Sequence, residues 1–184
     1  MTNFANTAVS DRRFALLRTM GLVIGASLFI AVCARLSLPL PFTPVPLSLA
    51  NFGVLAVGLV LGSRRGFAAC IAYLMMGAAG LPVLSPFGSG GFLHLFGPTG
   101  GYLLAYPVVA YIAGMGTESS GFGRKLVSSI AAELFLFACG VSWLMVLAHV
   151  PFAKAAAFGL YPFVFFEGMK VMGAAGMATK FKIS

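Results

Sequence analysis

Charged residues are scarce in this sequence of 184 residues: Asp, Glu, Lys and Arg make up 9% of it, and only four residues are acidic. Soluble domains contain about 25% charged residues, whereas 60% of this sequence is apolar. The net charge of +8 does not indicate nucleic-acid binding, because the basic residues are scattered in twos between apolar segments and form no patch. The class of protein that fits is a membrane protein with several membrane-spanning segments.

Motifs for metal, nucleotide or enzyme chemistry are also missing. The three cysteines lie within apolar segments without CxxC spacing, so they indicate neither a zinc site nor a disulfide framework. The glycine-rich segment 88–101 lacks the lysine that a phosphate-binding loop requires. There is no HExxH motif and no serine–histidine pair with a recognisable spacing. We therefore expect that the chain is not an enzyme and binds no metal or cofactor itself.

Apolar segments long enough to cross a bilayer fill nearly the whole sequence. A helix needs about 20 apolar residues to cross ~30 Å of hydrocarbon. The sequence predicts such spans at residues 15–34, 45–62, 66–84, 101–117, 126–148 and 156–178. The predicted fold class is therefore an all-α membrane protein with a bundle of six transmembrane helices. We expect one integral membrane domain over residues 1–184, with a short N-terminal tail at 1–14.

The basic residues predict how this bundle is oriented. Nine of the twelve fall on one side, before or at the start of the first span, in the second and fourth connections, or after the last span: Arg12, Arg13, Arg18, Arg64, Arg65, Arg124, Lys125, Lys180 and Lys182. Only Arg35 and Lys154 fall on the other side, and Lys170 lies within a span. The positive-inside rule then places both termini in the cytoplasm. We expect the chain in the inner, cytoplasmic membrane of the cell.

Two charged residues lie within the last predicted span, one helical turn apart: Glu167 and Lys170. A charged side chain near the membrane centre costs at least ~2.5–3.5 kcal/mol, so their presence indicates a function. As ligand-binding groups they offer an acceptor and a donor. As a structural ion pair they neutralise each other, because residues i and i+3 of a helix are neighbours. The sequence leaves both interpretations open.

Two connections on the predicted outer side have unusual compositions. Residues 37–48 contain four prolines, which predicts a stiff, extended, polyproline-like segment suited to act as a lid. Residues 80–102 are too apolar for a solvated loop, which predicts that they dip back between helices. Thr99 is a predicted N-cap that leaves the backbone N–H groups of Gly100 to Tyr102 free for an acceptor on a ligand. A surface turn stiffened by prolines is the alternative for this segment.

Several sequence motifs occur in an order that is similar to that of a known protein family. They are Pro39-Leu40-Pro41 with Pro44-Val45-Pro46, Leu61-Gly62-Ser63-Arg64-Arg65-Gly66, Gly80-Leu81-Pro82-Val83, Gly97-Pro98-Thr99-Gly100-Gly101-Tyr102 and Glu167-Gly168-Met169-Lys170. Together they resemble the BioY family, the biotin-binding S components of energy-coupling factor (ECF) transporters. The resemblance implies a bundle of the S-component type that binds biotin with high affinity from outside. It also implies uptake with a T-type membrane subunit and two ATPases, which consume the ATP.

The same resemblance implies a set of binding residues. Glu167 accepts hydrogen bonds from the ureido N–H groups of biotin, and Lys170 donates to the ureido carbonyl or to the carboxylate tail. The further substrate-binding candidates are Ser89, Thr99, Gly100, Tyr102 and Asn51, and the candidate lid is Pro44, Val45 and Pro46. The sequence departs from the family in two places: Glu167 replaces an aspartate, and Ala50 replaces a glutamine. Asn51 is the residue that could replace the missing glutamine amide.

A partner-docking face is predicted in the first span. Gly21 and Gly25 form a small-xxx-small pair that resembles the alanine-rich face by which S components dock on the T subunit. Close packing inside the bundle is an equally good explanation of the pair. The alternative function is a self-sufficient secondary transporter or channel for biotin or another small solute, although the sequence has no convincing internal repeat.

His94, Glu133 and several aromatic residues are interpreted from their positions in the predicted spans and connections. His94 is interpreted as an interfacial loop residue, because no other ionisable residue lies near it in the sequence. Glu133, in the fifth span, has no evident partner there, and a structural and a functional role are left open. The aromatic residues Tyr73, Tyr102, Tyr106 and Trp143 are interpreted as packing or interface residues.

Overall fold

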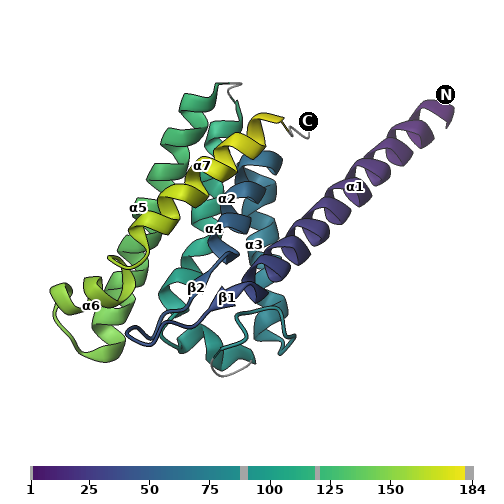
Figure 1. Cartoon of the computed structure of the whole chain (residues 1–184). Coiled ribbons are helices and arrows are strands. Elements are labelled where there is room, and N and C mark those ends of the chain that lie inside the picture. The colour runs from purple at the N-terminus through teal and green to yellow at the C-terminus, as the bar shows by residue number, and fades with distance from the viewer. Residues whose placement is uncertain (1, 88–90, 119–120, 181–184) are drawn as a thin grey trace.

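The computed structural model describes residues 2–87, 91–118 and 121–180, and most of them are helical (Figure 1). The helices are α1 Thr2–Arg35, α2 Ala50–Leu61, α3 Ser63–Ala78, α4 Gly100–Gly114, α5 Phe122–Ala148, α6 Phe152–Gly159 and α7 Val164–Lys180. Two 3-10 helices, η1 Gly91–Phe96 and η2 Met115–Glu118, precede and follow α4. Between α1 and α2 lies an antiparallel hairpin of β1 Ser37–Leu38 and β2 Leu47–Ser48.

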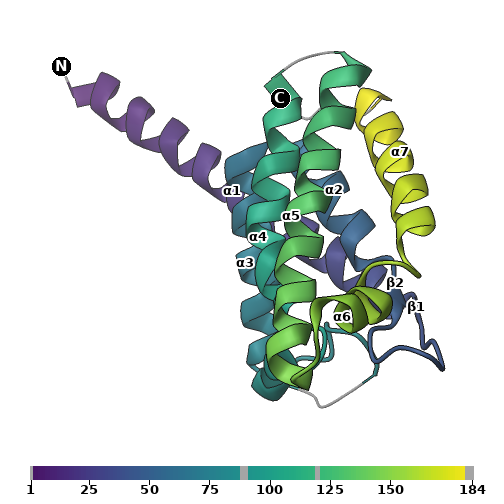
Figure 2. The same cartoon turned by 90° about the vertical axis from the view of Figure 1, so that its left-hand side faces the viewer.

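Helices α2, α3, α4, α5 and α7 lie side by side in a bundle (Figures 1 and 2). Only the C-terminal part of α1 packs on this bundle, and its N-terminal part, which includes the predicted tail, projects away from it. The hairpin, η1 and α6 gather at one end of the bundle, and the C-terminal end of α7 lies at the other (Figure 1). The end with the hairpin, called the structured end below, carries short elements that an outline of six helices does not include.

Among the described residues, two helical segments are both long and apolar enough to cross a membrane. They are Arg13–Arg35, within α1, and Phe122–Ala148, which is α5. Helix α2 is strongly apolar but has only 12 residues, which gives it a length of ~18 Å. The helical class that the sequence predicts is confirmed, and the count of six spans stays a prediction.

Three predicted spans have the wrong bounds. The second, 45–62, is wrong at its start, because Leu47–Ser48 is a strand and α2 begins at Ala50. The third, 66–84, is too long, since α3 ends at Ala78. The last, 156–178, is two helices, α6 and α7, separated by a turn at residues 160–163. Pro162 lies in that turn, and a proline disfavours helical geometry in the residue before it.

The proline-rich connection is a hairpin, so the predicted polyproline-like geometry is wrong at its ends. Ser37 pairs with Ser48 and Leu38 with Leu47, and the hydroxyl of Ser37 donates to that of Ser48 at 2.8 Å. The prolines lie between the paired residues, where no ladder hydrogen bond needs their missing N–H. The connection is thus folded back on itself across the end of the bundle (Figure 1).

Glycines allow the helices of the bundle to approach closely. A Cβ atom at Gly58 of α2 would lie 2.4 Å from the carbonyl oxygen of Ala110 in α4. A Cβ atom at Gly66 of α3 would lie 2.9 Å from the Cα atom of Gly58. Small residues at such contacts are typical of helices that associate in lipid, because they bring the backbones together. This close packing holds α2, α3 and α4 around the cavity described next.

Candidate binding site

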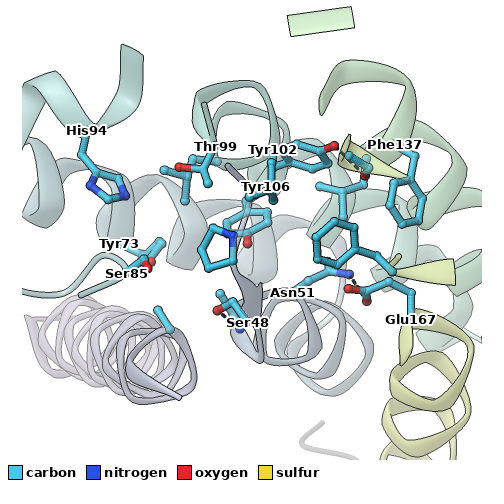
Figure 3. Close-up of a pocket in the computed structure, with 18 residues that line it drawn as sticks. Ser48, Asn51, Tyr73, Ser85, His94, Thr99, Tyr102, Tyr106, Phe137 and Glu167 are labelled. Atoms are coloured by element: carbon cyan, nitrogen blue, oxygen red, sulfur yellow. Dashed lines mark hydrogen bonds between the residues drawn. The ribbon is translucent and has the colours of Figure 1, made fainter. Parts of the chain in front are cut away.

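A cavity lies inside the structured end of the bundle (Figure 3). The hairpin, the seven α-helices described above and the segment around η1 contribute to its wall, or lie directly beside it, through Ala34, Val45, Pro46, Ser48, Ala50, Asn51, Tyr73, Ser85, His94, Thr99, Tyr102, Leu103, Tyr106, Leu136, Phe137, Gly159, Phe163 and Glu167. Its volume of about 70 Å³ is below the ~300–1,000 Å³ of typical ligand pockets. A ligand of vitamin size therefore requires part of this wall to move.

Most of the wall is apolar and aromatic. Tyr73, Tyr102, Tyr106, Phe137 and Phe163 all line the cavity, so the interpretation of the tyrosines as packing residues omits this role. The hydroxyl of Tyr102 donates to the carbonyl oxygen of Gly159 at 2.7 Å, which fixes the ring against α6. Such a wall suits the largely apolar part of a ligand, with a few polar groups left to determine its orientation.

The polar groups form a connected network at one end of the cavity. The Lys170 ammonium donates to Oε1 of Glu167 at 2.6 Å and to the backbone oxygen of Ser48 at 2.6 Å. The Asn51 amide nitrogen donates to Oε2 of Glu167 at 2.8 Å and to Oε1 of Glu133 at 2.5 Å. The exposed fractions of Asn51, Glu133, Glu167 and Lys170 are 4%, 7%, 8% and 8%. The network joins three helices, α2, α5 and α7, and the hairpin strand β2 through residues that lie far apart in the sequence.

The members of this network face different spaces. Asn51 and Glu167 line the cavity and lie next to each other in Figure 3. Glu133 does not line it and sits behind them. Lys170 lines a separate groove between the hairpin and α7. The geometry gives Lys170 the role of a support that joins Glu167 to the hairpin, and its direct contact with a ligand stays a prediction.

His94 lies at the other end of the cavity from Asn51 and Glu167 (Figure 3). Its side chain is only 5% exposed, so the interpretation of His94 as an interfacial loop residue is wrong. Leu84 and Leu95 of the same segment are buried as well, whereas Leu81, Leu93 and Phe96 are exposed, so only part of this segment packs against the helices and its re-entry between them stays a prediction. A buried histidine could not be predicted from the sequence, since its neighbours in space come from other helices.

The predicted cap of α4 is only partly correct. Thr99 directly precedes α4 and lines the cavity, but its side chain makes no capping hydrogen bond. The backbone N–H of Gly100 donates to the carbonyl oxygen of Gly97 at 2.9 Å. The prediction that this N–H is free for a ligand is therefore wrong. Ser89, another predicted contact, lies outside the described residues.

The predicted lid closes one side of the cavity. Val45 and Pro46 line the cavity, and Val45 is buried. Pro44 is not among the lining residues. The hydroxyl of Thr43 donates to the carbonyl oxygen of Phe158 at 2.5 Å, which fastens the hairpin to α6. The hairpin is therefore held at Thr43 and, through the Ser48 carbonyl, at Lys170.

Gly21 and Gly25 lie on the outside of the bundle. Both are exposed, and a Cβ atom at either would have no neighbouring atom within 4 Å. They line an apolar groove beside α1 together with residues of α2 and α7, including Ala56, Val57 and Met177. Packing of these glycines inside the bundle does not occur in the structure, and docking of a partner there stays a prediction.

Known proteins resemble this chain both in sequence and in structure. The biotin transporter BioY of Thermotoga maritima is 38% identical over 154 residues, which cover 83% of this chain and 89% of that protein. The probable biotin transporter BioY of Pyrococcus horikoshii is 36% identical over 137 residues, which cover 74% and 80%. The crystal structure of the S component for biotin from an ECF-type ABC transporter matches with a TM-score of 0.82 and 25% identity, over 90% of this chain and 91% of that one.

These relatives are transporters or transporter components by name, and not enzymes, as the sequence predicts for this chain. The family model that matches this sequence covers residues 5–184 and so includes all elements that form the cavity. The resemblance found in the order of the sequence motifs is thereby confirmed, and this chain belongs to the BioY family.

Proposed function

We propose that this chain binds biotin with high affinity and serves as the substrate-specific subunit for its uptake across the cytoplasmic membrane. The observation that carries this proposal is an aromatic cavity with a buried amide–carboxylate network at one end, inside a fold that matches a biotin S component. Biotin has a largely apolar sulfur ring, a ureido group with two N–H donors and one acceptor, and a carboxylate tail. Asn51 and Glu167 supply acceptors for the ureido donors, and the aromatic wall covers the rings.

We propose the predicted topology for this subunit: six crossings, made by α1 to α5 and by α6 with α7, and both termini in the cytoplasm. Several contacts support a common side for the basic connections. Arg64 and Arg124, from the second and fourth connections, line one groove. Lys125 donates to the carbonyl oxygen of Ala178 at 2.6 Å, which brings the end of α7 to the same side. The excess of basic residues then faces the cytoplasm.

The partners in this proposal are a T-type membrane subunit and two ATPases, with the lipid bilayer around them. The structural relative is a component of an ECF-type ABC transporter, which supports partner subunits of this kind. ATP is consumed by the ATPases, and this chain needs to bind only the vitamin. The groove at Gly21 and Gly25, on the outside of the helix bundle, is the surface proposed to dock on the T subunit.

Equilibrium binding to the purified chain tests the proposal. Labelled biotin should be retained, and unlabelled biotin should displace it. Lipoic acid is the matched competitor, because it has a sulfur ring and the same carboxylate tail but no ureido group. Equal displacement by lipoic acid would contradict a site built around the ureido group. A purified chain that retains no biotin would contradict the proposed function itself.

Replacing Pro44, Val45 and Pro46 together by glycine should raise the dissociation rate of biotin roughly tenfold. The change removes the buried Val45 side chain from the wall and gives the hairpin more conformational freedom to lose on closure. The association rate should change less, because the Thr43 contact to α6 that seats the hairpin is retained. Stopped-flow or filter-binding kinetics with labelled biotin measure both rates.

Pro82→Gly is the control for this lid variant. Pro82 is exposed, lies in a connection and does not line the cavity, so its loss should leave both rates as in the parent. An unchanged dissociation rate in the triple glycine variant would show that the hairpin is not the lid.

A further inference from the structure

Glu133 of α5 is the member of the polar network whose role the sequence leaves open. We infer that Glu133 is a positioning residue: together with Glu167 it holds the Asn51 amide so that the amide oxygen is presented to the cavity as a hydrogen-bond acceptor. The inference rests on the proposed function, because the donor that this oxygen meets is a ureido N–H of biotin. It assigns a binding role to a residue that makes no contact with the cavity itself.

The two carboxylates determine which way the Asn51 amide points. Its nitrogen carries two N–H groups, and these are directed to Glu133 Oε1 at 2.5 Å and Glu167 Oε2 at 2.8 Å. When both carboxyl groups are ionised, an amide oxygen placed between them finds no donor, so the orientation with the amide nitrogen between them is the one that satisfies all three groups. The contacts join residues 82 and 116 positions apart. Helices α2, α5 and α7 are thereby connected through one side chain.

The amide oxygen of Asn51 is left as an acceptor by this arrangement. Asn51 is 4% exposed and lines the cavity. Within the described part of the chain, its Oδ1 is buried and has no hydrogen-bond partner. A buried polar atom without a partner is unfavourable, so a ligand N–H that reaches Oδ1 gains a hydrogen bond without displacing a protein donor.

Glu167 is a less available acceptor than Asn51. Its Oε1 already accepts from Lys170 and its Oε2 from Asn51. A ligand N–H can share either oxygen, but only in addition to these short contacts. Loss of Glu133 would release one N–H of Asn51 and allow the amide to rotate, so that the cavity could present a donor where biotin also presents one. Glu133 therefore acts on affinity through the orientation of Asn51.

The test compares purified Glu133→Ala, Glu133→Gln, Asn51→Ala and the double variant Asn51→Ala, Glu133→Ala. Both Glu133 variants should bind labelled biotin roughly tenfold more weakly than the parent. In Glu133→Gln the new amide can donate to Asn51 Oδ1 and so occupies the acceptor that biotin needs. Ser129→Ala is the matched control: Ser129 is a buried polar residue one turn earlier on α5, and its hydroxyl donates to the backbone oxygen of Lys125. It should bind as the parent does.

A double-mutant cycle separates positioning from a general effect on folding. If Glu133 acts through Asn51, Glu133→Ala should cause no further loss in the Asn51→Ala background. A biotin analogue methylated at the ureido nitrogen that meets Asn51 should bind the parent weakly and be insensitive to Glu133→Ala. Thermal stability is measured for every variant, and if Glu133→Ala does not fold, the isosteric Glu133→Gln decides.

Parent-like affinity in both Glu133 variants, or a loss that adds to that of Asn51→Ala, would overturn the positioning role while the proposed function stands. A parent chain that binds no biotin would instead overturn the proposed function, and with it the ureido group as the partner of Asn51. The two failures are thus distinguished by the parent measurement alone.

Discussion

Replacing Glu167 by glutamine should reduce biotin affinity by two orders of magnitude or more and should also lower the thermal stability. The glutamine oxygen can accept from Lys170 or from Asn51, whereas the carboxylate accepts from both at once. The Lys170 ammonium, 8% exposed, is then left without its counter-charge. Breaking a buried ion pair in this way costs ~3–5 kcal/mol of folding stability. A loss of ~2.8 kcal/mol of binding free energy corresponds to a hundredfold weaker affinity.

Lys170→Met and the double variant Glu167→Gln, Lys170→Met distinguish a binding role from a structural one. Lys170→Met should also weaken binding, because it releases the hairpin at Ser48 and leaves Glu167 less firmly held. The double variant removes both charges from the membrane, which is often neutral or stabilising. We expect its melting temperature to recover while its affinity stays as low as that of the worse single variant.

The measurement is equilibrium binding of labelled biotin to the parent, the two single variants and the double variant, each purified in detergent, with a thermal melt alongside. A double variant that melts and binds like the parent would contradict the assignment of Glu167 to the binding site. The pair would then be a structural ion pair, the other interpretation of its spacing.

Gly25→Leu should abolish partner-dependent biotin uptake and leave biotin binding by the purified chain unchanged. Gly25 is exposed in a groove beside α1, and a side chain there meets no other atom of the chain within 4 Å at its Cβ position. The bundle can therefore accept the leucine, whereas a helix of the T subunit that approaches Gly21 and Gly25 closely cannot. Uptake is measured in cells that express the complete transporter, and binding is measured on the isolated chain.

Gly123→Leu provides the control for this variant. Gly123, near the start of α5, has the same open surroundings but lies on another helix, so both its uptake and its binding should match the parent. If Gly25→Leu loses binding as well as uptake, the face is needed inside this chain and is not a docking surface. Uptake at the parent rate would remove Gly25 from the proposed interface.

The charged pair of the site could be predicted from the sequence, whereas its surroundings could not. Glu167 and Lys170 are three residues apart on one helix, so their ion pair follows from helical periodicity. Asn51 joins the same network although it lies 116 residues before Glu167 in the sequence. Glu133, which contacts Asn51, lies 82 residues after it. No periodicity relates residues at such separations. Asn51 was predicted from the family resemblance, and the role of Glu133 stayed open.

The places where the predicted spans are interrupted show the same difference between what the sequence predicts and what the tertiary structure adds. Prolines predicted that the segment between α1 and α2 is not helical, but they did not predict that it folds into a hairpin in which Ser37 pairs with Ser48. The last apolar segment is long enough for one span, and hydropathy alone predicted a continuous helix over 156–178. It breaks after Gly159 in the turn that contains Pro162, and the carbonyl oxygens of Phe158 and Gly159 at the end of α6 accept from Thr43 and Tyr102.

Composition, hydropathy and motif order by themselves determined that this chain is a helical membrane protein, where its unusual charged pair lies and which family it resembles. These properties depend on residue type and on neighbours a few positions away. Only the tertiary structure decided that His94 is buried at one end of a cavity, that Lys170 supports the hairpin, and that Glu133 and Glu167 share the amide of Asn51. Those properties depend on how helices far apart in sequence are packed, because packing determines which polar atoms find partners and which are left facing the ligand.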